Sequence, residues 1–196
     1  MNKQSVRDVS LTGKRVLMRV DFNVPLRDGV VSNDARIRAA LPTLRYVLEQ
    51  GPKALILLSH LGRPKGRPDP RWSLKPVAGR LMELLGRDLT FVSDCGGPIT
   101  RSSLARLPDG AILLLENTRF EPGETSNDPD FARLLASLAD IFVNDAFGAA
   151  HRAHASTVGV AQMLPAVGGL LMEGELDYLA TAPVAPRRPF LVLLGG

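Results

Sequence analysis

Residues 54–66 read ALILLSHLGRPKG, and this stretch decides the fold class. Its apolar run, 54–58, stops abruptly at a serine and at His60, and a basic loop rich in glycine and proline follows. A continuous apolar run of this length between turn signals is typical of a strand buried on both faces of a parallel sheet. Ligands of open α/β sheets bind just beyond the carboxyl ends of such strands. The stretch therefore predicts that His60 and Arg63 reach a ligand site, with Gly62 letting the backbone come close.

The same pattern, an apolar run followed directly by polar side chains, occurs at three other places. The runs are 15–20 before Asp21 and Asn23, 111–115 before Glu116, Asn117 and Arg119, and 141–143 before Asn144, Asp145, His151 and Arg152. Parallel strands end at one edge of their sheet, so these side chains are expected to form a single polar site. Arginine, histidine and asparagine in such numbers suit a small anion.

Helix signals alternate with the strand signals in the manner of βαβ units. Helices are predicted from the capping residues 32–34 to Glu49, and over 73–86, 98–107, 129–139 and 173–179, with a short further strand over 89–92. The fold class expected from this alternation is α/β, a three-layer α/β/α arrangement with a mostly parallel, Rossmann-like sheet.

The composition limits the classes of protein to consider. The 196 residues, 45% of them apolar, can bury a full core, and the net charge of +4 is a modest basic excess. Nucleic-acid binding needs a clustered basic stripe, often with stacking aromatic side chains, whereas here both signs of charge are mixed and Trp72, Tyr46 and Tyr178 are scattered. Cys95, the single cysteine, cannot form an internal disulfide or a thiolate zinc site. No signal-peptide segment and no apolar run of membrane-spanning length is found, so a cytoplasmic protein without a membrane or nucleic-acid partner is expected.

The familiar motifs of nucleotide and hydrolase sites are missing from the sequence. There is no G-x-x-x-x-G-K-S/T loop, no G-x-G-x-x-G loop and no G-x-S-x-G elbow, and the three histidines lack a convincing metal-ligand spacing. The chemistry must therefore depend on the residues at the strand ends.

Each of these residues also has an ordinary structural interpretation. Asp21 and Asn23 could orient a substrate hydroxyl, or they could cap a turn as Asx side chains do. Arg36 lies in the first turn of a predicted helix, where a positive charge is unfavourable unless it meets an anion; alternatively it is a solvated surface arginine. Arg119 and Arg152, taken singly, could equally be surface residues, and it is their equivalent placement after strands that favours a common site.

Six stretches carry a family resemblance. They are RVDFNVP (19–25), DARIR (34–38), SHLGRP (59–64), ENTRF (116–120), NDAFGAAHRAHAS (144–156) and LLMEGEL (170–176). In this order and spacing they closely resemble phosphoglycerate kinase, over essentially the whole chain but over only the N-terminal half of the family. The departures are mild: Thr118 stands where the family often has an apolar residue, and the loop 122–126 is less acidic than in many relatives.

The resemblance implies a glycolytic transferase, a kinase that moves a phosphoryl group reversibly between 1,3-bisphosphoglycerate and ADP to give 3-phosphoglycerate and ATP. It implies that Asp21 and Asn23 bind the hydroxyl region of the substrate, and that Arg36 is catalytic and steadies the charge on the moving phosphoryl group. The other substrate-binding residues that it implies are His60, Leu61, Gly62, Arg63, Arg119 and Arg152, of which His60 and the arginines hold the 3-phosphate. Phosphoryl transfer needs positioning and charge stabilisation more than a covalent nucleophile, so no catalytic serine or cysteine is missing.

The resemblance also implies a division into domains. Residues 1–182 are expected to form the substrate-binding domain, 183–189 a linker or hinge, and 190–196 the first strand of a nucleotide-binding domain that is absent from this chain. Mg-ATP or Mg-ADP would bind to that absent domain, so neither cofactor nor metal is expected on this chain. We expect a monomer that binds 3-phosphoglycerate weakly and does not turn over alone, because the two substrates of the family bind domains that close on a hinge.

Two other function classes stay open at this point. A non-catalytic module could use the same arginine cluster to bind a phosphate ligand for regulation. A nucleic-acid binder would instead show DNA affinity that falls steeply with salt.

Overall fold

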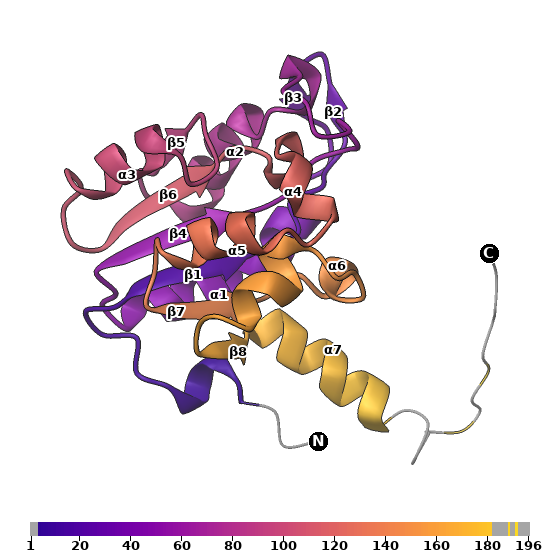
Figure 1. Ribbon diagram of the computed structural model, residues 1–196. Helices are drawn as coiled ribbons and strands as arrows, with labels where there is room; N and C mark the ends of the chain where they lie inside the picture. The colour runs from indigo at the N-terminus through magenta and orange to yellow at the C-terminus, as the bar shows by residue number, and fades with distance from the viewer. Residues whose placement is uncertain (1–3, 182–187, 189–190, 192–196) are drawn as a thin grey trace.

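The computed structural model describes residues 4–181 together with Arg188 and Leu191, and its centre is one parallel sheet (Figure 1). The strands are β1 (Arg15–Arg19), β4 (Ala54–Leu58), β5 (Thr90–Val92), β6 (Ala111–Leu115), β7 (Ile141–Asn144) and β8 (Ala166–Gly168), in the order β5-β6-β4-β1-β7-β8. Every strand pair of this sheet is parallel, and β4 is buried along its whole length. The α/β class with a parallel sheet, predicted from the apolar runs, is confirmed.

Helices cover both faces of the sheet. They are α1 (Ala35–Glu49), α2 (Lys75–Leu85), α3 (Pro98–Leu104), α4 (Pro122–Thr125), α5 (Pro129–Ala136), α6 (Phe147–Ala150) and α7 (Leu170–Thr181), with 3₁₀ turns η1 (Val6–Asp8), η2 (Pro70–Trp72) and η3 (Thr118–Phe120) and a π-helical turn η4 (Ala155–Gly159). Figure 1 shows α5 in front of the sheet and α1 behind it. Because strand side chains alternate, Val16 and Met18 pack with the apolar faces of α1 and α2, while Leu17 packs with α5.

Capping chemistry explains where two of the helices begin and end. The Asp128 carboxylate accepts hydrogen bonds from the backbone N–H groups of Asp130 and Phe131, and Pro129 occupies the first turn of α5. At the C-terminal end of α2, Gly86 adopts φ +66°, a left-handed conformation that glycine tolerates best. Both helices were predicted from the sequence, over 73–86 and 129–139.

Several details differ from the prediction, among them the helix predicted over 173–179, which spans Leu170–Thr181. The helices expected to reach residues 107 and 139 end at Leu104 and Ala136. In the first case Pro108 disfavours helical geometry in the residue before it. The hairpin of β2 (Leu26–Arg27) and β3 (Val30–Val31) and the three-residue strand β8 were not predicted.

Two further predictions concern the C-terminal residues and membrane-spanning helices. The predicted linker, 183–189, and the predicted strand, 190–196, lie outside the described residues except for Arg188 and Leu191. Across the part of the chain that the structure describes, no helix is both long and apolar enough to cross a membrane.

Asp145 joins the end of β7 to the start of α7. One carboxylate oxygen, Oδ1, accepts hydrogen bonds from the backbone N–H groups of Leu171 (3.0 Å) and Met172 (3.3 Å), and Thr43 also bonds to this side chain. The other oxygen, Oδ2, is buried without a partner among the described residues. Burial raises the pKa of Asp145 to about 6 despite these hydrogen bonds.

We therefore expect Asp145→Asn to stabilise the protein at neutral pH by about 1 kcal/mol. Between the unfolded value near pH 4 and the folded value near pH 6, the native state binds the extra proton, so the wild-type free energy of unfolding falls as the pH rises. An asparagine at position 145 keeps the Oδ1 acceptor for Leu171 and Met172. It carries no negative charge at neutral pH, so the cost of burying a charged group is removed. Urea denaturation from pH 4 to 8 should show a smaller fall for the variant, and an unchanged pH profile would contradict this role for Asp145.

Candidate functional site

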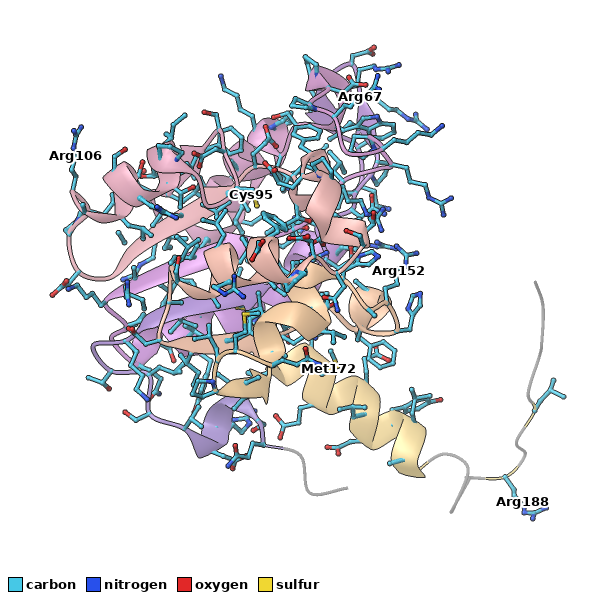
Figure 2. The ribbon with its side chains drawn as sticks, viewed as in Figure 1. Arg67, Cys95, Arg106, Arg152, Met172 and Arg188 are labelled. Atoms are coloured by element: carbon cyan, nitrogen blue, oxygen red, sulfur yellow. The ribbon has the colours of Figure 1, made fainter. Side chains whose placement is uncertain are left out.

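The carboxyl ends of the central strands bring the predicted residues to one edge of the sheet. Arg19, the last residue of β1, is in register with Leu58 at the end of β4 and with Asn144 at the end of β7. The segments that follow these strands, together with the segment after β6, carry all the residues assigned to substrate binding except Arg36, which lies in the first turn of α1. Figure 2 shows Arg152, beyond β7, on the same side of the molecule as α4 and α6.

Arg19, which the sequence analysis did not assign to the site, forms a hydrogen bond with the His60 ring. His60 is only 3% exposed, and its Nδ1 accepts a hydrogen bond of 3.0 Å from the guanidinium of Arg19. Burial, followed by the positive charges of Arg19 and Arg119, lowers the pKa of His60 to about 2. The imidazole is therefore neutral across the physiological range.

Two asparagines hold the loop that contains Leu61 and Gly62. Asn23 Oδ1 accepts a hydrogen bond of 2.9 Å from the backbone N–H of Gly62. Asn117, which is fully buried, accepts from the backbone N–H of Leu61 and donates to its carbonyl at 2.7 Å. These hydrogen bonds fix the loop to the segments that follow β1 and β6. We call the edge of the sheet formed by the segments after β1, β4, β6 and β7, together with the first turn of α1, the rim.

At Gly62 an added side chain would not fit. Its φ is +59°, and a Cβ atom built there would overlap the ring of Trp72. The indole therefore packs directly on the loop backbone. Glycine is required here both by the left-handed backbone and by the close approach of the ring.

We expect Gly62→Ala to destabilise the protein by about 1–3 kcal/mol, because alanine adds backbone strain and overlaps Trp72. Urea denaturation followed by circular dichroism would measure the change. Gly79→Ala is the matched control: Gly79 lies inside α2 with nothing within 4 Å of the added Cβ, so the same substitution should be neutral or stabilising. Equal stabilities for the two variants would contradict the assignment.

Arg119 lies at the centre of the rim and has an unused donor. One of its terminal nitrogens donates a hydrogen bond of 2.7 Å to the carbonyl of Gly62, but its buried Nε has no partner among the described residues. Burial and then the charges of Arg152 and Arg19 lower the pKa of Arg119, and Arg63 acts in the same direction. A buried donor without a partner, surrounded by like charges, is the arrangement that an anion would relieve.

The remaining predicted residues lie around this centre. Arg36 forms an ion pair of 2.9 Å with Asp21, and its side chain is about half exposed. Asp21 Oδ1 also accepts from the backbone N–H of Asn23, which is the turn-capping interpretation considered above. Arg152 is half-buried and donates from Nε to His151 at 3.2 Å. The structure thus places both members of the Asp21–Arg36 pair on the rim, and the substrate roles of all these residues stay predictions.

A buried polar network below the rim was not predicted. Glu124 is fully buried and accepts hydrogen bonds from the backbone N–H and the hydroxyl of Ser156, at 3.0 and 2.6 Å, and from Thr118 at 3.2 Å. The Ser156 hydroxyl in turn accepts a hydrogen bond of 2.9 Å from Arg19 Nε. Among the described residues, this network contains the principal negative charge facing Arg19.

Nothing in the described part of the chain suggests a metal centre. No group of three or more histidine, cysteine, aspartate or glutamate side chains there could hold a metal ion. Cys95 is buried, and burial raises the pKa of its thiol, which disfavours the reactive thiolate.

Comparisons with known proteins agree on one family. The family model for phosphoglycerate kinase matches residues 6–196. Over all 196 residues the chain is 58% identical to a phosphoglycerate kinase of Fervidobacterium nodosum and 55% identical to one of Thermosipho africanus, covering 49% and 48% of those proteins. The chain thus spans about half the length of the curated relatives it matches.

Solved structures give the same result. The fold is similar to a phosphoglycerate kinase from Coxiella burnetii, with a TM-score of 0.84 and 39% identity, covering 95% of this chain and 46% of that one. It is also similar to one from Pyrococcus horikoshii OT3, with a TM-score of 0.85 and 34% identity, covering 95% and 47% of the two chains.

Proposed function

The chain belongs to the phosphoglycerate kinase family, and from this premise we propose that it supplies the acid-substrate site for reversible phosphoryl transfer between 1,3-bisphosphoglycerate and ADP. The observation that carries the proposal is the buried, unpartnered Nε of Arg119 among like charges. A doubly charged phosphate is the ligand that best matches an arginine fork with a free donor.

Each residue group has a part in this proposal. Arg63, Arg119, Arg152 and His60 bind the 3-phosphate, and the backbone of the Gly62 loop lies beside it. Asp21 and Asn23 orient the carbon skeleton through its hydroxyl group. The enzyme then gains rate by holding the acid in one position, which is a large part of catalysis in phosphoryl transfer.

Arg36 is the residue proposed to act on the reacting group. It lies in the first turn of α1, its side chain is about half exposed, and only Asp21 is ion-paired with it among the described residues. A guanidinium at this position can follow the negative charge as it moves from the acyl phosphate toward the nucleotide. The carboxylate of Asp21 keeps the fork oriented when no substrate is bound.

We propose that the nucleotide and its Mg²⁺ bind to the other half of the family's length, which this chain does not span. Bound there, Mg²⁺ would neutralise charge on the nucleotide phosphates. The residues of the present chain then hold the acid, exclude water from it and stabilise charge at its acyl end. In the same proposal the protein is a cytoplasmic monomer, its partners are small molecules, and this chain alone is inactive.

Calorimetric titration with 3-phosphoglycerate tests the proposal. We expect weak binding to the wild-type chain, none with glycerate (which lacks the phosphate), and a loss of about tenfold or more in Arg36→Ala and Arg63→Ala, because a charge-assisted contact is worth roughly 1.5–3 kcal/mol. Unchanged affinity in both variants would refute the site. A coupled turnover assay, run on this chain with and without a nucleotide-binding half added in trans, separates a kinase from a phosphate-binding regulatory module.

A further inference from the structure

The donor and acceptor roles in the network below the rim are determined by chemistry alone. An arginine guanidinium can only donate hydrogen bonds, so the nitrogen of His60 that faces Arg19, Nδ1, must be the unprotonated one. A neutral imidazole carries one proton, which must then be on Nε2. Nε2 makes no hydrogen bond with any residue that the structure describes and is therefore a donor available to a ligand.

Arg19 can perform this task only because it is itself held in place. Its side chain is fully buried at the end of β1, with Nε donating to Ser156 at 2.9 Å and a terminal nitrogen donating to the carbonyl of Val20 at 2.6 Å. In the described part of the chain it forms no ion pair with a carboxylate within 4.0 Å, so its charge is compensated across the Ser156 hydroxyl by Glu124. A hydroxyl has one proton; here Glu124 receives it, which leaves the oxygen free to accept from Arg19.

We infer that Arg19, Ser156 and Glu124 form a positioning device that holds His60 in the Nε2–H form and aims this donor at the ligand. Arg19 is a positioning residue, since it acts through His60. The inference deepens the proposed function and rests on it for the identity of the ligand, but the tautomer of His60 is a property of the free protein. The site thereby offers a neutral donor beside its guanidinium groups, and it keeps that donor when the pH changes.

The charges around His60 support this reading. Arg19, Arg119, Arg152 and His154 all face His60 and oppose its protonation, in addition to its burial. A histidine intended to carry a positive charge would instead lie beside a carboxylate. Glu124, the buried carboxylate of this region, bonds to Ser156 and not to His60.

Nitrogen NMR of the chain labelled with ¹⁵N-histidine tests the inference directly. The chain has three histidines, so the His60 signals can be assigned by comparison with His60→Gln. We expect Nε2 of His60 to carry the proton and Nδ1 to be bare, with no change between pH 5 and 8. A proton on Nδ1, or titration within this range, would overturn the inference.

Variants separate positioning from simple structural support. Arg19→Met removes the donor but leaves Glu124 as an uncompensated buried charge, so it could fail by unfolding. The double variant Arg19→Met with Glu124→Gln removes both charges and should fold. We expect His60 to populate both tautomers in this double variant, and we expect the double variant to bind 3-phosphoglycerate about tenfold more weakly than the Glu124→Gln single variant.

The outcomes are distinguishable from a failure of the proposed function. If the double variant keeps one His60 tautomer and the affinity of Glu124→Gln, Arg19 is only structural and the inference is wrong. If the wild-type chain binds neither 3-phosphoglycerate nor inorganic phosphate, the proposed ligand is wrong, while the NMR spectra of the wild type and the double variant still decide whether Arg19 sets the tautomer.

Discussion

Replacing Arg119 by alanine is expected to weaken binding of 3-phosphoglycerate by about tenfold to a hundredfold, the largest loss of affinity for any single residue of the rim. A charge-assisted contact to phosphate is worth roughly 1.5–3 kcal/mol, and here the fork contributes through a nitrogen that is already desolvated. The substitution also removes the hydrogen bond to the Gly62 carbonyl. Calorimetry on the purified variant would measure the loss.

Two further variants make this result interpretable. Arg106→Ala removes the same charge from an exposed position, which Figure 2 shows on the opposite side of the molecule from Arg152, and should bind like the wild type. Arg119→Lys keeps the charge but not the planar fork, so its affinity should be intermediate. Wild-type affinity in Arg119→Ala would mean that the anion does not bind at this arginine.

The second large effect concerns stability. Glu124→Ala is expected to lower the free energy of unfolding by about 3–5 kcal/mol, because it removes the principal negative charge that compensates the buried Arg19 and also removes the acceptor of Ser156. Urea denaturation at neutral pH would show the transition at a much lower concentration, with a similar slope.

Glu121 provides the matched control, since it is a glutamate three residues earlier in the same segment. Burial, followed by the charge of Asp94, raises the pKa of Glu121, so its ionised form is already disfavoured. Glu121→Ala should therefore change the stability little or increase it. If both alanine variants unfold at the same urea concentration, the buried network does not contribute the stability assigned to it.

The central sheet could be predicted because its strands are continuous apolar runs. The run at 54–58 is buried at every position, and its abrupt change to polar residues marks the strand end within one residue. The β2–β3 hairpin was missed because each strand has only two residues and no apolar run. Its signal was the pair Asp28-Gly29: both residues have positive φ, +51° and +75°, as a tight hairpin turn requires.

The candidate site was predictable in part, for a similar reason. Residues such as His60 and Arg119 directly follow apolar runs, so their position at the strand ends can be inferred from the sequence. Arg19 and Glu124 lie 105 positions apart and interact only through Ser156, and no local pattern connects them. The available signal was an arginine inside an otherwise apolar strand, since such a charge must find buried partners.

The packing of Trp72 on Gly62 has a practical consequence. Trp72, in η2, is the only tryptophan of the chain, so all of the indole emission comes from a side chain that packs against the loop between His60 and Arg63. Ligand entry that shifts this loop would be visible as a change in fluorescence, without a dye or an introduced label. The kinetics of substrate arrival could then be followed in a rapid-mixing instrument with the unmodified protein.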